Sequence, residues 1–135
     1  MRPDNIFSFA KVFVPINIHN MHWVLAVAFM QKKTIVYYDS LRDESKGKIY
    51  LKCMLRYLSD EAEDKQQYFN KVEWKLLIKK VPQQTNGNDC GVFACMFADL
   101  VLDDINVEHL QQGMMEDFRR KICYAILRRR IPYPL

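Results

Sequence analysis

Hydrophobic residues form short runs typical of strands in some parts of the chain and repeat at helical spacing in others. Four apolar runs are predicted to be strands: Lys11–Ile16, Trp23–Phe29, Thr34–Tyr38 and Trp74–Ile78. The second run is apolar on both alternating faces, as expected of a central strand that is covered on each side. Polar residues 31–33 separate the second run from the third, so these two strands are predicted to form a hairpin.

Three other segments place their apolar residues on one helical face. These residues are Leu51, Met54, Leu55 and Leu58 within 46–67, Phe93, Met96, Phe97, Leu100 and Val101 after a polar loop, and Phe118, Ile122, Ala125 and Ile126 near the end. The polar loop, Gln83–Asp89, contains the turn signal Asn86-Gly87, and Asn88 or Asp89 is placed to cap the helix that follows. The pattern predicts an α+β fold, a small mixed sheet packed against helices.

The composition supports one globular unit and argues against several classes of protein. A chain of 135 residues that is 50% hydrophobic is sufficient for one domain over residues 1–135. No run approaches the roughly 18 apolar residues of a membrane span, and no secretory signal is present, so we expect a protein of the nucleus or cytoplasm without membrane contact. With 20 basic against 16 acidic residues, the net charge of +4 does not predict nucleic-acid binding.

Cys90 lies where the polar loop becomes the first turn of an apolar helix. The unpaired amides and the dipole at that end of a helix favour a thiolate, which is the form that a nucleophilic cysteine needs. The alternative is a buried cysteine that packs as a small hydrophobe, and we expect this of Cys53, Cys95 and Cys123. Without a secretory signal, all four cysteines are predicted to be free thiols.

A thiolate also needs a base, and His22 and Asp39 are candidates for the base and for the group that orients it. If a tight turn at residues 31–32 joins the second and third strands, His22 lies opposite Leu41. Asp39 is then its diagonal neighbour, at about 7–8 Å between backbones. Separately, a histidine at a strand end or an aspartate in a turn is more often without a catalytic role. Together on one face of a hairpin, the two favour a functional role.

Gln84 lies six residues before Cys90 in the polar loop. Its amide could donate, together with the Cys90 backbone N–H, to the oxyanion that forms when a carbonyl is attacked. Position alone does not separate Gln84 from Gln83, and a loop glutamine without any role is the alternative.

No metal ion or cofactor is expected. The spacing of Cys90 and Cys95 within a helical pattern, with three scattered histidines, does not fit a zinc site. No nucleotide-binding, dinucleotide-binding or serine-hydrolase motif is present.

Three segments resemble the signature segments of the SUMO-specific (sentrin/ubiquitin-like-specific) cysteine proteases. They are His22-Trp23, YYDSL at 37–41 and PQQTNGNDCGVF at 82–93, in the family's order His, Asp, Gln, Cys. The resemblance also includes VPINIHNMHW at 14–23 and INVEHLQQGMMEDFRRKI at 105–122, so it covers nearly the whole chain. It implies a fold of the papain-like cysteine protease type.

The same resemblance implies a role for each residue of the site. Cys90 would attack the peptide or isopeptide carbonyl after a Gly-Gly terminus, with His22 as acid and base and Asp39 orienting His22. Gln84, rather than its neighbour, would be the oxyanion donor. Trp23 resembles the tryptophan that covers the narrow diglycine channel in this family. Its alternative is a core aromatic on a buried strand, and the two roles are compatible.

The main departure from the family lies at the front of the chain. Family catalytic domains carry helices and a strand, including a Trp-Leu-Asn-Asp-like segment, ahead of the segment that starts here shortly before His22. The resemblance therefore implies an N-terminally truncated domain that lacks the N-terminal helical part and leaves an apolar face uncovered.

The leading hypothesis is a thiol isopeptidase that removes SUMO from conjugates or trims its precursor. We expect a monomer whose partner is SUMO, or a related ubiquitin-like protein, and its conjugates. One alternative is a protease for NEDD8 or another ubiquitin-like modifier, because the catalytic segments do not encode which modifier is held. Another is a truncated, inactive module that only binds a ubiquitin-like protein.

Overall fold

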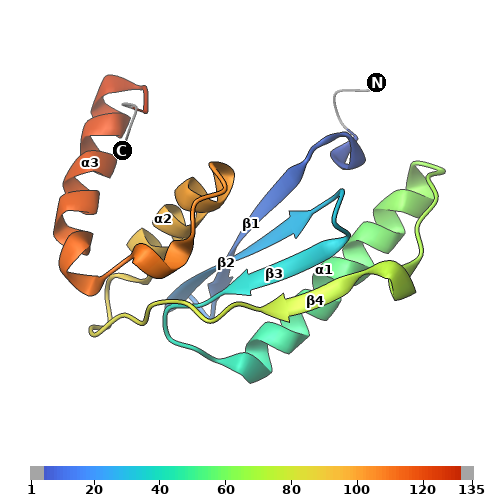
Figure 1. Ribbon diagram of the computed structural model, residues 1–135, viewed down its shortest axis with the longest axis horizontal. Coiled ribbons are helices and arrows are strands. Elements are labelled where there is room, and N and C mark those ends of the chain that lie inside the picture. The colour runs from blue at the N-terminus through green and yellow to red at the C-terminus, as the bar shows by residue number, and fades with distance from the viewer. Residues whose placement is uncertain (1–4, 132–135) are drawn as a thin grey trace.

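Four strands form one sheet in which neighbours along the chain are also neighbours in space (Figure 1). They are β1 (Lys11–Ile18), β2 (His22–Phe29), β3 (Thr34–Tyr38) and β4 (Lys75–Ile78). β1, β2 and β3 run antiparallel, whereas β4 returns parallel to β3 after a helical crossover. This computed structural model describes residues 5–131 of the chain. It confirms the predicted mixed sheet and all four strands, with ends that differ by one or two residues.

The pairing of β2 with β3 follows the predicted register. Leu25 pairs with Tyr38 at one end of the ladder, and a tight turn after Met30 joins the strands at the other. Across this turn the Lys33 N–H donates to the Met30 carbonyl at 3.4 Å. Continued past the last pair, the same register brings the start of β2 and the residue after β3 to one end of the sheet.

Within the described residues, three α-helices complete the α+β fold: α1 (Glu44–Asp64), α2 (Cys90–Leu102) and α3 (Met115–Arg128). α1 packs on β3 and β4, α2 packs on the opposite face of the sheet, and α3 packs on α2 (Figure 1). All three helices were predicted, although α1 begins at Glu44, where the Asp43 side chain accepts from the Lys46 N–H. Single turns of 3-10 helix precede or follow these elements: η1 (Ile6–Ser8), η2 (Lys71–Glu73), η3 (Val107–His109) and η4 (Gln112–Met114).

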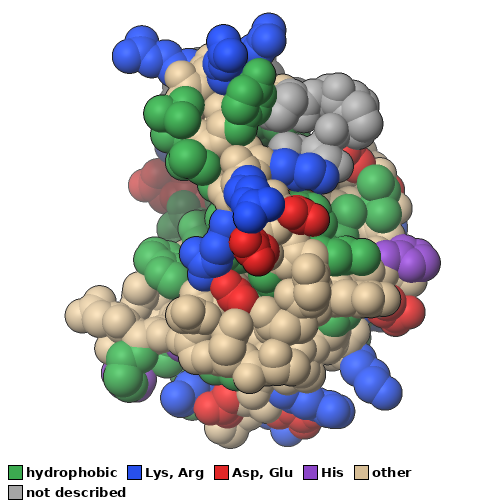
Figure 2. Space-filling view, turned by 90° about the vertical axis from the view of Figure 1, so that its left-hand side faces the viewer, with side chains coloured by type: hydrophobic (Ala, Val, Ile, Leu, Met, Phe, Trp, Pro, Cys, Tyr) green, Lys and Arg blue, Asp and Glu red, His purple; other side chains and the backbone are tan. Residues whose placement is uncertain are grey.

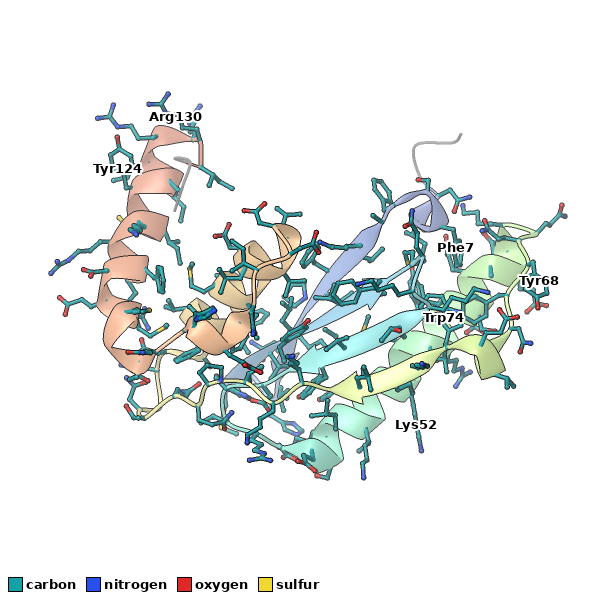
Figure 3. The ribbon with its side chains drawn as sticks, in the orientation of Figure 1. Phe7, Lys52, Tyr68, Trp74, Tyr124 and Arg130 are labelled. Atoms are coloured by element: carbon teal, nitrogen blue, oxygen red, sulfur yellow. The ribbon has the colours of Figure 1, made fainter. Side chains whose placement is uncertain are left out.

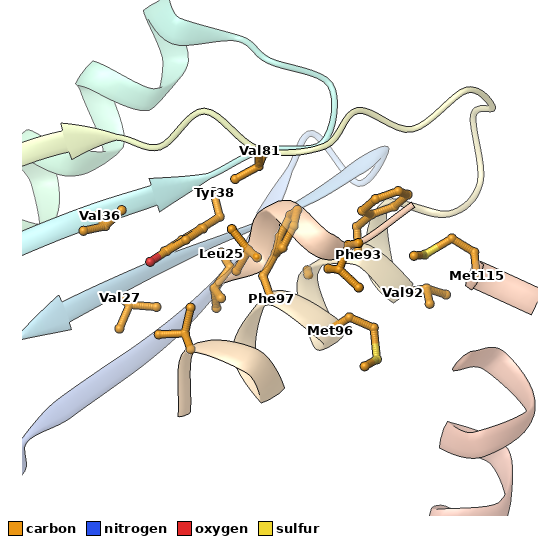
Figure 4. Close-up of a cluster of buried hydrophobic side chains, with 14 residues drawn as sticks. Leu25, Val27, Val36, Tyr38, Val81, Val92, Phe93, Met96, Phe97 and Met115 are labelled. Atoms are coloured by element: carbon orange, nitrogen blue, oxygen red, sulfur yellow. The ribbon is translucent and has the colours of Figure 1, made fainter. Parts of the chain in front are cut away.

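β2 is the central strand of the core, because its alternate side chains enter two separate apolar clusters. The cluster on the α2 face is centred on Leu25, Val27, Phe93 and Phe97 (Figure 4). The cluster on the α1 face includes Val24, Ala26, Ala28, Leu51 and Leu58. Residues 24–28 are at most 2% exposed, which confirms the prediction of a strand that is covered on both sides.

The end of the sheet remote from α3 is closed by aromatic side chains (Figure 3). The rings of Phe7 and Phe69 lie 6.2 Å apart between centroids, and Phe69 stacks on Trp74 at 5.3 Å. These contacts join the segment before β1 to the segment before β4, so the first and last strands of the sheet are anchored to each other at this end.

The prediction that Cys53, Cys95 and Cys123 are buried is wrong. All three are exposed, because they lie on faces of α1, α2 and α3 that point away from the two apolar clusters. Partial burial of the Cys95 sulfur nevertheless raises the pKa of its thiol. Cys90, in contrast, is buried. All four cysteines are free, which confirms the prediction of free thiols.

Within residues 5–131, none of the helices combines the length and the apolar character that crossing a bilayer requires.

Close packing between α1 and the sheet predicts the effect of one small substitution. A Cβ at Gly47 would lie 2.8 Å from Tyr37 Cδ1 and 3.2 Å from Ile78 Cδ1, and the Tyr37 ring is fully buried. We expect Gly47→Ala to lower the free energy of unfolding by about 1–2 kcal/mol, because overpacking outweighs the gain in helix propensity. Urea unfolding would measure this change.

The matched control is Gly113→Ala, where no atom lies within 4 Å of the added carbon. It should change the free energy of unfolding by no more than about 0.5 kcal/mol. Equal stabilities of the two variants would contradict the proposed contact between α1 and β3.

Candidate active site

The start of β2, the residue after β3 and the start of α2 meet at one end of the sheet. His22 is the first residue of β2 and closely follows the tight turn His19-Asn20, where both residues have positive φ. Asp39 follows the last residue of β3. Cys90 is the first residue of α2, and its Sγ lies 3.5 Å from the Trp23 backbone nitrogen. Because Trp23 directly follows His22, the thiol lies against the strand end that carries the imidazole.

Asp39 holds the His22 ring in one orientation. Its Oδ1 lies 2.6 Å from His22 Nε2. The carboxylate is itself fixed, since Oδ1 also accepts from the Leu41 N–H at 2.8 Å and Oδ2 accepts from the Asp43 N–H at 3.0 Å. Asp39 is only 3% exposed, so little water competes for these bonds. The predicted proximity of His22 and Asp39 is confirmed.

The other ring nitrogen of His22 has no partner of its own. Nδ1 is buried and makes no hydrogen bond within residues 5–131. A carboxylate beside Nε2 keeps the proton on that nitrogen and leaves a lone pair on Nδ1. A buried polar atom without a partner costs free energy and calls for a physical reason. The lone pair on Nδ1 is therefore free to accept a hydrogen bond.

Cys90 lies on the wall of an apolar groove of about 710 Å³. The groove runs between β1, α2 and α3, and its lining includes Phe13, Pro15, Trp23, Ala98 and Ile122. Cys90 itself is 7% exposed. Its sulfur lies at the first turn of α2, whose amides have no side-chain acceptor.

Trp23 is not a core residue. The residue is 43% exposed, which rules out the alternative of a core aromatic on a buried strand. The ring lies over the start of α2, where its Cδ1 would be 3.8 Å from a Cβ at Gly91. Trp23 therefore stands beside the Cys90 thiol at the edge of the groove.

The structure separates Gln84 from Gln83. The Gln83 amide donates to two backbone carbonyls, at 3.0 and 3.1 Å, so both of its N–H groups are used. The Gln84 amide donates to the Asn86 carbonyl at 2.6 Å, and its oxygen accepts from the Ser40 hydroxyl at 2.5 Å. Among residues 5–131, one N–H group of Gln84 is thus left without an acceptor.

Asp89 occupies the N-cap position of α2 but does not cap the helix. The prediction that the side chain of Asn88 or Asp89 caps the helix is wrong, because no side chain bonds the first-turn amides there. The Asp89 carboxylate accepts instead from Asn86, Gln112 and Arg119, and these bonds hold its pKa below the ordinary value. The sequence carries no signal for the last two contacts, which span 23 and 30 residues.

The site has the groups that nucleophilic attack on a carbonyl requires. They are a buried thiol, an imidazole with an unpartnered nitrogen, a carboxylate that orients the imidazole, and an amide with a spare N–H. In the part of the chain that the structure describes, no three His, Cys, Asp or Glu side chains gather as metal ligands would.

Sequence comparison leads to one family of proteases. A family model described as the Ulp1 protease family, C-terminal catalytic domain, matches residues 1–131. Sentrin-specific protease 2 of Mus musculus is 36% identical over 131 residues, which cover 94% of this chain and 22% of that protein. Ubiquitin-like-specific protease 1 of Saccharomyces cerevisiae is 34% identical over 88 residues, which cover 64% of this chain and 14% of that protein. The chain therefore spans less than a quarter of the length of these relatives.

Solved structures of Ulp1-type proteases share the fold. The C-terminal Ulp1 protease domain in complex with Smt3, the yeast ortholog of SUMO, matches with a TM-score of 0.83 and 29% identity, covering 92% of this chain and 55% of that chain. The Ulp1-like SUMO protease catalytic domain of Chaetomium thermophilum matches with a TM-score of 0.70 and 26% identity, covering 91% of this chain and 47% of that chain. The resemblance and the fold class inferred from the sequence are confirmed. The chain belongs to the Ulp1 protease family and corresponds to part of its C-terminal catalytic domain.

Proposed function

We propose that this chain is a thiol protease that cleaves after the C-terminal Gly-Gly of SUMO, in its precursor or its conjugates. The observation that carries the proposal is the His22 ring, bound to Asp39 through Nε2 and left without a partner at Nδ1, next to the backbone that contacts Cys90 Sγ. Support for the substrate comes from the similar Ulp1 domain that was solved in complex with a SUMO ortholog.

In the proposed reaction, His22 moves a proton between the thiol and the leaving group. Nδ1 takes the proton from Cys90 Sγ, and the thiolate attacks the carbonyl carbon of the scissile bond. The imidazolium, stabilised by Asp39, then gives its proton to the departing amine. A water molecule, deprotonated by the same imidazole, hydrolyses the thioester and regenerates the thiol.

The negative charge on the carbonyl oxygen needs donors that are already in place. We assign this role to the Cys90 backbone N–H and to the spare N–H of Gln84. The Ser40 hydroxyl and the Asn86 carbonyl hold the Gln84 amide rigidly, so little reorganisation is needed as charge develops.

Trp23 is the residue that we propose to cover the end of the modifier beside the thiol. Its ring stands at the edge of the groove, over the start of α2. Two successive glycines have no side chains, so they could pass a narrow space that other residues could not.

The function predicts a covalent product with an activity-based probe. The chain should react with SUMO bearing a thiol-reactive C-terminus and shift to higher mass on a denaturing gel. NEDD8 and ubiquitin probes should react more slowly or not at all, and Cys90→Ala should abolish the shift.

Each other result of this experiment selects a different hypothesis. A shift with the NEDD8 probe alone would replace SUMO by NEDD8 as the modifier. Absence of any shift, from a chain that unfolds cooperatively and still binds SUMO in solution, would leave an inactive module that only binds a ubiquitin-like protein.

The two adjacent glutamines predict a contrast in turnover. Gln84→Ala should lower kcat for cleavage of a SUMO precursor roughly 10²- to 10³-fold with little change in KM, because the lost N–H acts only on the transition state. Gln83→Ala removes a tether to backbone carbonyls and should cost less than about tenfold. Equal losses in the two variants would refute the assignment of Gln84.

A further inference from the structure

The Asp89 carboxylate lies away from the helix end that it is placed to cap. An aspartate at an N-cap position usually has extended backbone and accepts from an amide of the first turn. Asp89 has φ −99° and ψ 4°, and its side chain makes no such bond. The first-turn amides of α2, which begins at Cys90, are therefore left without a side-chain acceptor.

Four N–H groups bind the Asp89 carboxylate elsewhere. Oδ2 accepts from Asn86 Nδ2 at 2.7 Å and from Gln112 Nε2 at 2.6 Å. Oδ1 accepts from Arg119 Nε at 2.9 Å and from Arg119 Nη2 at 2.6 Å. The side chain of Asp89 is 9% exposed, so these four bonds satisfy a nearly buried carboxylate.

We propose that Gln112 and Arg119 are positioning residues that hold the Asp89 carboxylate off the first turn of α2 and so keep that turn open to the Cys90 sulfur and to the oxyanion. The proposal rests on the proposed role of Cys90 as the nucleophile. Neither residue contacts the reacting atoms, so both act through Asp89.

A carboxylate that did cap α2 would oppose the chemistry in two ways. It would occupy an amide at the helix end that favours an anion. It would also place a negative charge near the sulfur, and a like charge disfavours a thiolate. Arg119 counters both effects, because it both displaces and neutralises the carboxylate.

The same residues fix the loop that leads to the nucleophile. Gln112 Oε1 accepts from the Thr85 N–H at 2.8 Å, and Arg119 Nη2 donates to the Asn88 carbonyl at 2.6 Å. The loop between Gln84 and Cys90 is thus attached to η4 and α3 at three residues. Figure 2 faces the α3 side of the molecule and shows Lys and Arg side chains next to Asp and Glu side chains near its centre.

The test measures the pH dependence of Cys90 alkylation by iodoacetamide, with the modified residue identified by tandem mass spectrometry. Identification is needed because Cys53, Cys95 and Cys123 are exposed thiols. The wild-type chain is the reference for every variant, because other ionisable groups lie at the same end of the sheet. They include His22 from β2, Asp39 after β3, Asp89 from the loop and Arg119 from α3.

Arg119→Ala should raise the pH midpoint of the Cys90 alkylation rate by about one unit, because the released carboxylate turns toward the helix end. The matched control is Arg120→Ala, next along α3, where the guanidinium is exposed and pairs with Glu116 on the same helix. This variant should keep the wild-type midpoint. If Arg119→Ala does not unfold cooperatively, Arg119→Gln keeps most of the stem and serves with the same expectation.

The decisive variant combines Asp89→Ala with Arg119→Ala. Removing the carboxylate removes its effect on the sulfur, so the midpoint should return to within about 0.3 units of the wild-type value. A purely structural role for Arg119 predicts instead that the double variant is at least as perturbed as the single one. That result, or a midpoint for Arg119→Ala equal to that of Arg120→Ala, would overturn the proposal.

The proposed function and the positioning proposal are tested by separate measurements. The modifier probes test the function, whereas alkylation by iodoacetamide requires no ubiquitin-like protein and tests only the positioning residues. If no SUMO, NEDD8 or ubiquitin probe reacts but both midpoint shifts are observed, the proposed protease function is refuted and the positioning role of Arg119 is supported. If the SUMO probe reacts but Arg119→Ala does not shift the midpoint, the proposed function is supported and the positioning role of Arg119 is refuted.

Discussion

The register between β2 and β3 is the constraint on which the rest of the structure depends. The pairing of Leu25 with Tyr38 decides which side chains of β2 face α1 and which face α2, and a slip by one residue would exchange the two faces. The same pairing sets His22 and Asp39 at one end of the sheet, with the 2.6 Å contact between them. The apolar core and the candidate active site are therefore consequences of one ladder of hydrogen bonds.

The irregular loop before Cys90 gains its fixed shape from segments on either side of it. On one side, the turn after β3 holds Gln84 through the Ser40 hydroxyl and carbonyl. On the other side, η4 and α3 hold Thr85 and Asp89. A loop with no regular structure pays a large entropic cost for order, and these bonds offset that cost at both ends of the loop. A rigid loop is what a preorganised oxyanion donor requires.

Periodicity predicted the elements and the hairpin register well, because each depends on neighbours in the sequence. The contacts that periodicity missed join residues far apart. Nothing near Asp89 indicates that its carboxylate binds Arg119, 30 residues away, rather than capping α2. The exposure of Cys53 and the different hydrogen-bond partners of Gln83 and Gln84 likewise depend on tertiary contacts rather than on neighbours in the sequence. The sequence position of such residues identifies them as candidates but does not predict which groups their side chains contact.

The family match extends through residue 131, well past the last residue that touches the proposed chemistry. In this C-terminal segment α3 packs on α2, the helix that begins with Cys90. Gln112 and Arg119 lie in the same segment and reach back to the loop before Cys90. In the proposed network, the cation that pairs with Asp89 comes from α3 and not from the helix that Asp89 precedes, so α3 contributes charge to this loop as well as packing.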